Sequence, residues 1–144
     1  MALEVYSFNW ILILIASVAS FIIGWLWYGP IFGKLWMKLN KKGDVDMRKG
    51  KNKSMIGMMA LSFVGTVITA YVLSILLSSL EIFGVGESMM LSFFIWLGFL
   101  MTTTILGSVL WEGKPWGLFV LNAAYWLVTL EVITLVLTYG MIWI

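Results

Sequence analysis

Eight of the nine basic residues in this chain lie between Ile31 and Lys53, in a polar segment that separates two long apolar runs. Loops rich in lysine and arginine resist translocation, so they stay on the cytoplasmic side of a membrane. The ninth basic residue, Lys114, lies in the short loop that a four-span topology places on the same side. This partition predicts a multi-pass membrane protein with loop 31–53 in the cytoplasm and both termini outside.

The composition excludes a soluble domain of this length. Hydrophobic residues make up 62% of the 144 residues and charged residues 11%, far fewer charges than a soluble surface requires. The absence of cysteine and histidine excludes disulfides and the zinc or haem sites built on those side chains. Any other metal site would need carboxylates, carbonyls or methionine thioethers, and we interpret the ten methionines as apolar filler. We predict no cofactor and no metal centre. Nucleic-acid binding is not expected either, because there is no second basic surface to follow phosphates.

Four apolar runs are each long enough to cross the ~30 Å hydrocarbon core of a bilayer as a helix. They cover about residues 9–28, 55–79, 88–110 and 116–139. We expect an all-α integral membrane protein in which residues 1–144 form a single four-span domain. Tryptophans cluster near the ends of the runs, as interfacial anchors do; they are Trp10, Trp25, Trp27, Trp111, Trp116 and Trp143.

A short amphipathic helix is predicted directly after the first span. Gly29-Pro30 is expected to end the first helix, and Pro30 suits the first position of the next one. Apolar residues then fall on one helical face and lysines fall off it, which is typical of a helix lying in the membrane interface. The apolar set is Ile31, Phe32, Leu35, Trp36 and Leu39, and the lysines are Lys34, Lys38 and Lys41.

Small residues recur at every fourth position in the first two spans. Helices inside lipid associate through close packing, so such stripes predict contact faces. The hydroxyls could alternatively line a polar path, but this spacing is common in ordinary bundles and we interpret the stripes as packing seams. The seam of the second span is Ser62, Thr66, Ala70, Ser74 and Ser78, and that of the first is Ala16, Ser20 and Gly24.

Several segments resemble a known family. Asn9-Trp10, the run from Leu26 to Lys34 (LWYGPIFGK) and Trp36 are similar to the signature of a prokaryotic membrane family, the domain-of-unknown-function family numbered seventeen sixty-one. Later segments of the chain also resemble motifs of this family. These are Trp96, Gly98-Phe99, Thr103-Thr104, Glu112-Gly113 and Asn122-Ala123-Ala124-Tyr125. The resemblance implies four transmembrane helices in a prokaryotic cell membrane and no established activity. Glu131 departs from the pattern, because the family is expected to have an apolar residue there.

Five polar residues fall at or just below the cytoplasmic interface in this topology, namely Tyr28, Lys34, Glu112, Asn122 and Tyr125. Glu112 is expected to pair with Lys34, while Asn122 and Tyr125 lie three apart on one helix face and close the group. The group is either a small polar site open to the cytoplasm or a set of caps, anchors and one ion pair that hold the helices together. We favour the second interpretation, because turns must satisfy their backbone groups regardless of function.

Glu131 differs from this group because it lies near the middle of the fourth span. A carboxylate facing lipid there costs about 2.5–3.5 kcal/mol, so it is expected to be protonated or packed against protein. Nine residues separate it from Asn122, which at about 100° per residue places the two on opposite helix faces. If Asn122 points into the bundle, Glu131 points out of it, toward a partner subunit. The alternative is a protonated Glu131 bonded to its own helix backbone or to Thr134.

These features support functions of different classes. The first is a non-catalytic membrane scaffold or accessory subunit that acts through helix–helix contacts in a homo- or hetero-oligomer. The second is a small oligomeric transporter or channel in which Glu131 binds protons or a cation, helped by Thr102 to Thr104. A lipid-modifying enzyme using Glu112 and Tyr28 is the weakest candidate, because two dispersed groups make no nucleophile–base pair. We therefore predict no catalytic residues.

Overall fold

The structure is a computed structural model that describes residues 9–40 and 53–143. Every regular element within these residues is helical. The four segments long and apolar enough to cross a membrane are Trp10–Ile31, Ile56–Ser79, Val85–Leu110 and Trp116–Gly140. The predicted all-α fold with four membrane-length helices is therefore confirmed. Most of the basic loop, residues 41–52, lies outside the described residues.

The first span begins with α1 (Trp10–Leu26), continues through the π-helical turn η1 (Trp27–Ile31) and is followed by α2 (Gly33–Asn40). Asn9 is the N-cap of α1, because its side-chain oxygen accepts a hydrogen bond of 3.1 Å from the backbone N–H of Ile11. This contact satisfies one of the backbone donors left free at the start of a helix.

The chain stays helical through Pro30, so the prediction that Gly29-Pro30 ends the first helix is wrong. Pro30 lies inside η1, where the backbone N–H of Phe32 donates to the carbonyl of Trp27 over 2.9 Å, a spacing of five residues. A proline has no N–H to donate, and the wider π turn accommodates it without ending the helix. The helical path is instead interrupted at Phe32, and a short helix follows from Gly33.

The other three spans follow in the second part of the chain. The second span is α4 (Lys53–Ser79), and the fourth is α7 (Trp116–Trp143). The third consists of α5 (Val85–Ile95), the π-helical segment η2 (Trp96–Ile105) and α6 (Leu106–Leu110). A π-helical segment of ten residues is long, since such segments are mostly single turns inside α-helices.

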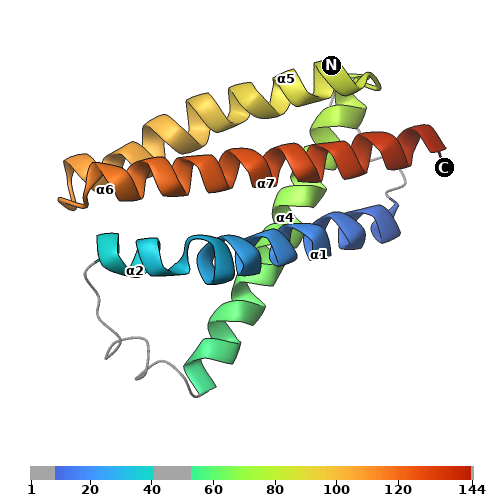
Figure 1. Cartoon of the computed structure of the whole chain (residues 1–144). Helices are drawn as coiled ribbons and strands as arrows, with labels where there is room; N and C mark the ends of the chain where they lie inside the picture. The colour runs from blue at the N-terminus through green and yellow to red at the C-terminus, as the bar shows by residue number, and fades with distance from the viewer. Residues whose placement is uncertain (1–8, 41–52, 144) are drawn as a thin grey trace.

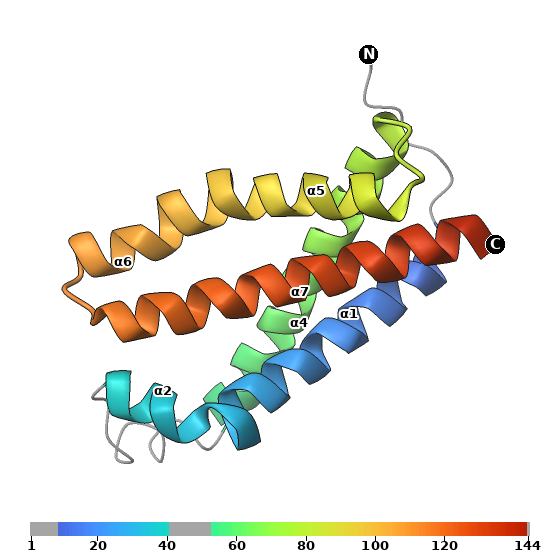
Figure 2. The same cartoon turned by 45° about the horizontal axis from the view of Figure 1, so that its top comes forward.

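α7 lies at the centre of the molecule (Figure 1). It runs antiparallel to α1 on one side and to the α5–α6 segment on the other (Figures 1 and 2), and it also contacts α4 and α2. α4 crosses obliquely, and its first half extends away from the other helices. Side chains on that half are correspondingly exposed, with Ile56 at 74% and Leu61 at 73%.

The apolar core lies where α1, α4 and α7 meet. Ala16 and Ala70 are both fully buried there, and their small side chains permit close approach of the helices. Of the rest of the predicted α1 stripe, Ser20 is buried and Gly24 is half-buried. The larger core residues are Leu12, Ile13, Leu73, Leu77, Ile133 and Leu137.

The small-residue stripe of α4 is buried only along part of its length. Ala70 and Ser74 are buried, Thr66 and Ser78 are half-buried, and Ser62 is exposed. The difference accompanies the oblique crossing of α4, whose first half extends away from the other helices (Figure 1), although Phe63 still packs edge-on against Phe21 of α1 with ring centroids 6.0 Å apart. The stripe is therefore a seam within this chain around Ala70 and Ser74, and Ser62 does not belong to it.

Candidate functional site

Tyr28 and Asn122 join the first and fourth spans near one end of the bundle. The Tyr28 hydroxyl, in η1, donates a 2.7 Å hydrogen bond to the side-chain oxygen of Asn122, in α7. The ring of Tyr125 lies edge-on to that of Tyr28, with centroids 4.9 Å apart. Three of the five residues predicted to form a polar group, Tyr28, Asn122 and Tyr125, are therefore in contact.

Two glycines allow the chain to close around Tyr28. A Cβ atom at Gly24 would lie 2.9 Å from the Tyr125 hydroxyl, so any side chain there would push against the tyrosine. A Cβ atom at Gly33 would lie 2.8 Å from the backbone carbonyl oxygen of Tyr28, which cannot move away easily. Gly24 thus brings α1 close to α7, and Gly33 brings α2 close to η1.

Two tryptophans, Trp36 and Trp27, also pack against this group. Trp36 of α2 packs edge-on against Tyr28, with ring centroids 6.0 Å apart. Trp27 packs against Tyr125 at 6.2 Å, and its indole N–H is buried without a hydrogen-bond partner among the described residues. Sequence reasoning treated Trp27 as an interfacial anchor and Trp36 as part of an apolar face. Nothing in the periodicity could show that both pack against tyrosines of the polar group.

Trp96 attaches the third span to the same level of α7. Its indole N–H donates to the backbone carbonyl of Ala123 over 2.8 Å. Ala123 follows Asn122 directly, so η1 and η2 are held to adjacent residues of α7. The sequence marked Trp96 only through the family resemblance, because its partner is a backbone carbonyl with no signature in the sequence.

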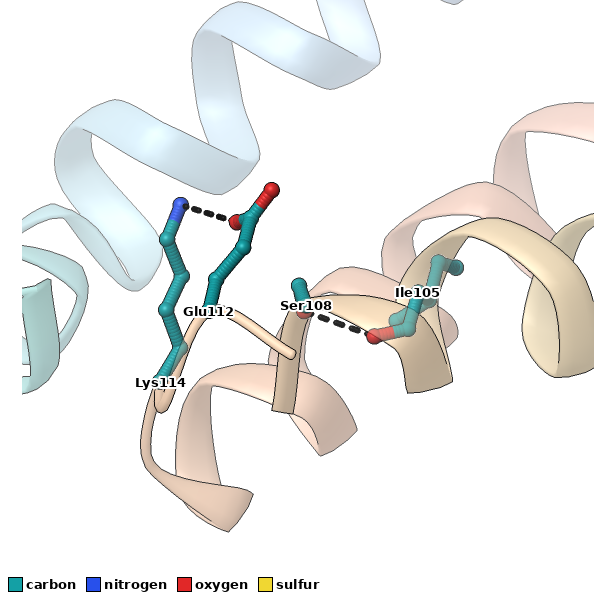
Figure 3. Close-up of polar contacts among 4 residues, drawn as sticks. All are labelled: Ile105, Ser108, Glu112 and Lys114. Carbon is teal, nitrogen blue, oxygen red and sulfur yellow. Dashed lines mark hydrogen bonds and ion pairs between the residues drawn. The ribbon is translucent and has the colours of Figure 1, made fainter. Parts of the chain in front are cut away.

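Lys34 and Glu112 do not form the predicted ion pair. Glu112 pairs instead with Lys114, with 3.7 Å between Oε2 and Nζ (Figure 3). The two residues flank Gly113, whose φ of 70° is a left-handed conformation that favours glycine. A pair within one turn needs no approach of two separate spans, whereas Lys34 lies exposed on α2. Lys34 and Glu112 are therefore not part of the group around Tyr28.

A second polar contact joins α5 to α7 and was not predicted. The hydroxyls of Ser92 and Thr134 are hydrogen-bonded to each other, and Thr134 donates its hydrogen to the carbonyl of Leu130 over 2.8 Å. Because a hydroxyl has one hydrogen, Ser92 is the donor to Thr134. Both side chains are fully buried. The contact satisfies buried hydroxyls inside a span, where no water is present to do so.

Glu131 lies on the side of α7 that carries Thr134 and Thr138, opposite Asn122 by helical geometry. The residue is half-buried, and its Oε2 atom is covered without a hydrogen-bond partner among the described residues. The alternative bond to Thr134 is not formed, since that hydroxyl contacts Leu130 and Ser92. Within this chain the carboxyl group is thus neither fully open to lipid nor fully satisfied.

The polar contacts of the candidate site hold helices together. Glu131 lies nine residues along α7 from Asn122, about 14 Å of helical rise, so its carboxyl cannot act on the Tyr28 hydroxyl. No group of three or more His, Cys, Asp or Glu side chains that could hold a metal ion occurs in the described part of the chain. The polar contacts instead connect η1, η2 and α5 to the central helix α7.

We expect Tyr28→Phe and Asn122→Ala to be coupled in a double-mutant cycle, because each variant removes the same hydrogen bond. The coupling in the free energy of unfolding in detergent should be about 0.5–1.5 kcal/mol. Tyr139→Phe, in the exposed part of α7, is the matched control and should show no coupling to Asn122→Ala. Additive effects of Tyr28→Phe and Asn122→Ala would contradict the assignment of this bond.

Four membrane-length helices, three of which are joined by hydroxyl, amide and indole hydrogen bonds, define a multi-pass α-helical membrane protein. The chain belongs to the DUF1761 family, described as a protein of unknown function, whose family model matches residues 11–138. This match confirms the family resemblance found in the sequence. No curated protein and no solved structure is significantly similar to the chain.

Proposed function

We propose that this protein is a non-catalytic scaffold or accessory subunit that acts through helix–helix contacts in a homo- or hetero-oligomeric membrane complex. The observation that carries the proposal is the covered Oε2 atom of Glu131, which has no hydrogen-bond partner among the described residues. An unpaired carboxyl at the middle of a span is costly. A donor on a neighbouring subunit would remove that cost if the half-buried side chain turns toward it.

The surface beside Glu131 is open to such a neighbour. Val128 is 39% exposed and Tyr139 is 50% exposed, and both lie within about 80° of Glu131 around the helix axis. A helix that covers these two side chains would also reach the carboxyl group. Lipid can cover the apolar side chains equally well, so the unsatisfied carboxyl is what favours a protein neighbour.

The remaining polar groups support a structural role. Each of the three cross-helix hydrogen bonds described above connects another span to α7, and none leaves a nucleophile beside a base. Groups engaged in this way stabilise the bundle. These contacts therefore support the proposed role as a packing module in a lipid bilayer.

A small oligomeric transporter or channel that uses Glu131 as a proton or cation site is the second candidate. The observation in its favour is a set of buried hydroxyls on neighbouring helices, Thr134 and Thr138 on α7 and Ser88 and Ser92 on α5. A carboxylate with nearby hydroxyls provides oxygen atoms, which suit protons and hard cations. Four helices enclose little space, so this candidate also requires an oligomer.

Native mass spectrometry of the protein extracted in mild detergent tests the proposal. A stable partner subunit in fixed stoichiometry is expected for an accessory subunit. A homo-oligomer alone is compatible with both candidates, which are then separated by the Glu131 variants discussed below. A monomer without any bound protein, in detergent that preserves the fold, would contradict both.

We place the protein in a prokaryotic cell membrane, with both termini outside and segment 31–53 in the cytoplasm. The chain has no cysteine, so single cysteines can be introduced without background labelling. A membrane-impermeant maleimide added to intact cells is expected to label Ala2→Cys and to spare Gly50→Cys. Lysed cells should show labelling of both variants. Labelling of position 50 but not of position 2 on intact cells would reverse the topology.

A further inference from the structure

α2 presents two lysines side by side at one end of the bundle. Lys34 and Lys38 lie four residues apart on one face of this helix, and both are exposed. Neither forms an ion pair within the part of the chain that the structure describes. Two like charges at this spacing repel each other, so the binding of an anion that contacts both lysines is favourable.

The helix that carries these lysines is packed against the bundle. Leu39 lies against α7 so closely that a Cβ atom at Gly117 would be 3.0 Å from its side chain. On the same face of α2, Trp36 packs against the ring of Tyr28. Because α2 is already positioned, binding of an anion by its lysines orders little additional chain.

Exposed aromatic and apolar side chains indicate the depth of this end in the bilayer. Trp111 is 89% exposed and Trp116 is 60% exposed, and they flank the turn between α6 and α7. This turn lies at the same end of the bundle as α2 (Figures 1 and 2). Tryptophan is enriched at the membrane–water interface, which places the lysines at the level of lipid headgroups.

We propose that Lys34 and Lys38 bind the phosphate of an anionic phospholipid in the bilayer. Leu35, adjacent to them on α2 and 44% exposed, would contact the upper part of an acyl chain. Lys114 is near this end but is paired with Glu112 at 3.7 Å, and that carboxylate repels a second anion from the turn. The site belongs to α2 and does not depend on the scaffold proposal, since a single copy of the chain contains it.

Native mass spectrometry with matched acyl chains measures this binding directly. The parent protein is expected to retain phosphatidylglycerol over phosphatidylcholine, and the two lysines together should supply roughly a thirtyfold preference. The double variant K34Q/K38Q should lose that factor, and K34R/K38R should keep it. K114Q removes one positive charge at the same end, where the double variant removes two, and it should leave the preference near the parent value because Lys114 is already paired with Glu112. Lys41 and Lys42 remain in every variant, so the comparison isolates the α2 lysines.

Three outcomes would overturn the proposal. These are a parent protein without preference for the anionic lipid, a K34Q/K38Q variant that keeps the preference, and a K114Q variant that loses as much. Binding of inorganic phosphate by a parent protein that shows no preference for the anionic lipid would show a phosphate site that is not a lipid site. If K34Q/K38Q fails to fold, the lipid preference of the parent protein is measured at increasing ionic strength instead. A preference that does not fall with ionic strength is not electrostatic and would contradict the proposal.

Discussion

Ala70→Leu is expected to separate α4 from the rest of the bundle or to unfold the protein. Ala70 is fully buried in the core where α1, α4 and α7 meet. Three additional carbon atoms cannot be accommodated there without moving α4, and overpacking of this kind costs about 1–3 kcal/mol. In a bundle that depends on close packing, this should appear as a lower midpoint of thermal unfolding in detergent.

Gly65→Leu, on the same helix, is the matched control. A Cβ atom at Gly65 would meet nothing within 4 Å, and Gly65 is exposed. The midpoint should be unchanged or slightly higher, because leucine favours a helix over glycine by up to about 1 kcal/mol. Equal midpoints of thermal unfolding for Ala70→Leu and the parent would show that α4 is not packed in the core. A destabilised Gly65→Leu would show that the first half of α4 is packed in the native assembly.

Substitutions of Glu131 are expected to separate the two candidate functions. If its carboxyl group contacts a partner subunit, Glu131→Gln should keep the assembly, since the amide fills the same space and still hydrogen-bonds. Glu131→Lys should disrupt it by placing a charge and a longer side chain in a packed contact, where an unpaired charge costs several kcal/mol. If Glu131 instead carries ions, Glu131→Gln should abolish flux in liposomes while the oligomer stays intact.

The control for Glu131→Lys is Phe99→Lys, which places the same charge at a side chain that is 72% exposed in the third span. Both variants carry the insertion cost of about 2.5–3.5 kcal/mol for a charge at mid-bilayer, but only the first alters the proposed contact. Native mass spectrometry measures the oligomer, and flux into liposomes measures transport. The scaffold proposal fails if Glu131→Lys leaves the oligomer unchanged and Glu131→Gln eliminates a measurable transport activity.

The number and type of spans could be predicted because each depends on local sequence alone. An uninterrupted apolar run of about 20 residues has only a helix available to it in lipid, so composition decides the outcome. The path at Pro30 could not be predicted, because an α-helical end and a π turn both accommodate a proline and the choice depends on packing around it. The oblique crossing of α4 could not be predicted either, because the Ser62–Ser78 stripe has the same spacing along its buried and exposed parts.

The candidate site could be predicted only in part, because the sequence does not show which group each polar side chain contacts. Tyr28, Asn122 and Tyr125 were grouped from depth and helix phase, and they do lie together. The pairing of Glu112 was wrong, because depth cannot distinguish Lys34 from a lysine two residues away in the same turn. Hydrogen bonds to backbone carbonyls, such as that of Trp96, leave no trace in the sequence because every residue offers the same acceptor.

The central position of α7 has a consequence for the order of biogenesis. The α5–α6 segment and η2 pack chiefly against α7, whereas α1 and α4 also contact each other. Chains are synthesised from the N-terminus, so α1 and α4 can associate while the third span still lacks its principal neighbour. Until α7 enters the membrane, Trp96 and Ser92 have no access to their acceptors on it, and their polar groups are exposed to lipid or to quality-control machinery. The interval between insertion of the third and fourth spans is therefore the vulnerable stage of assembly.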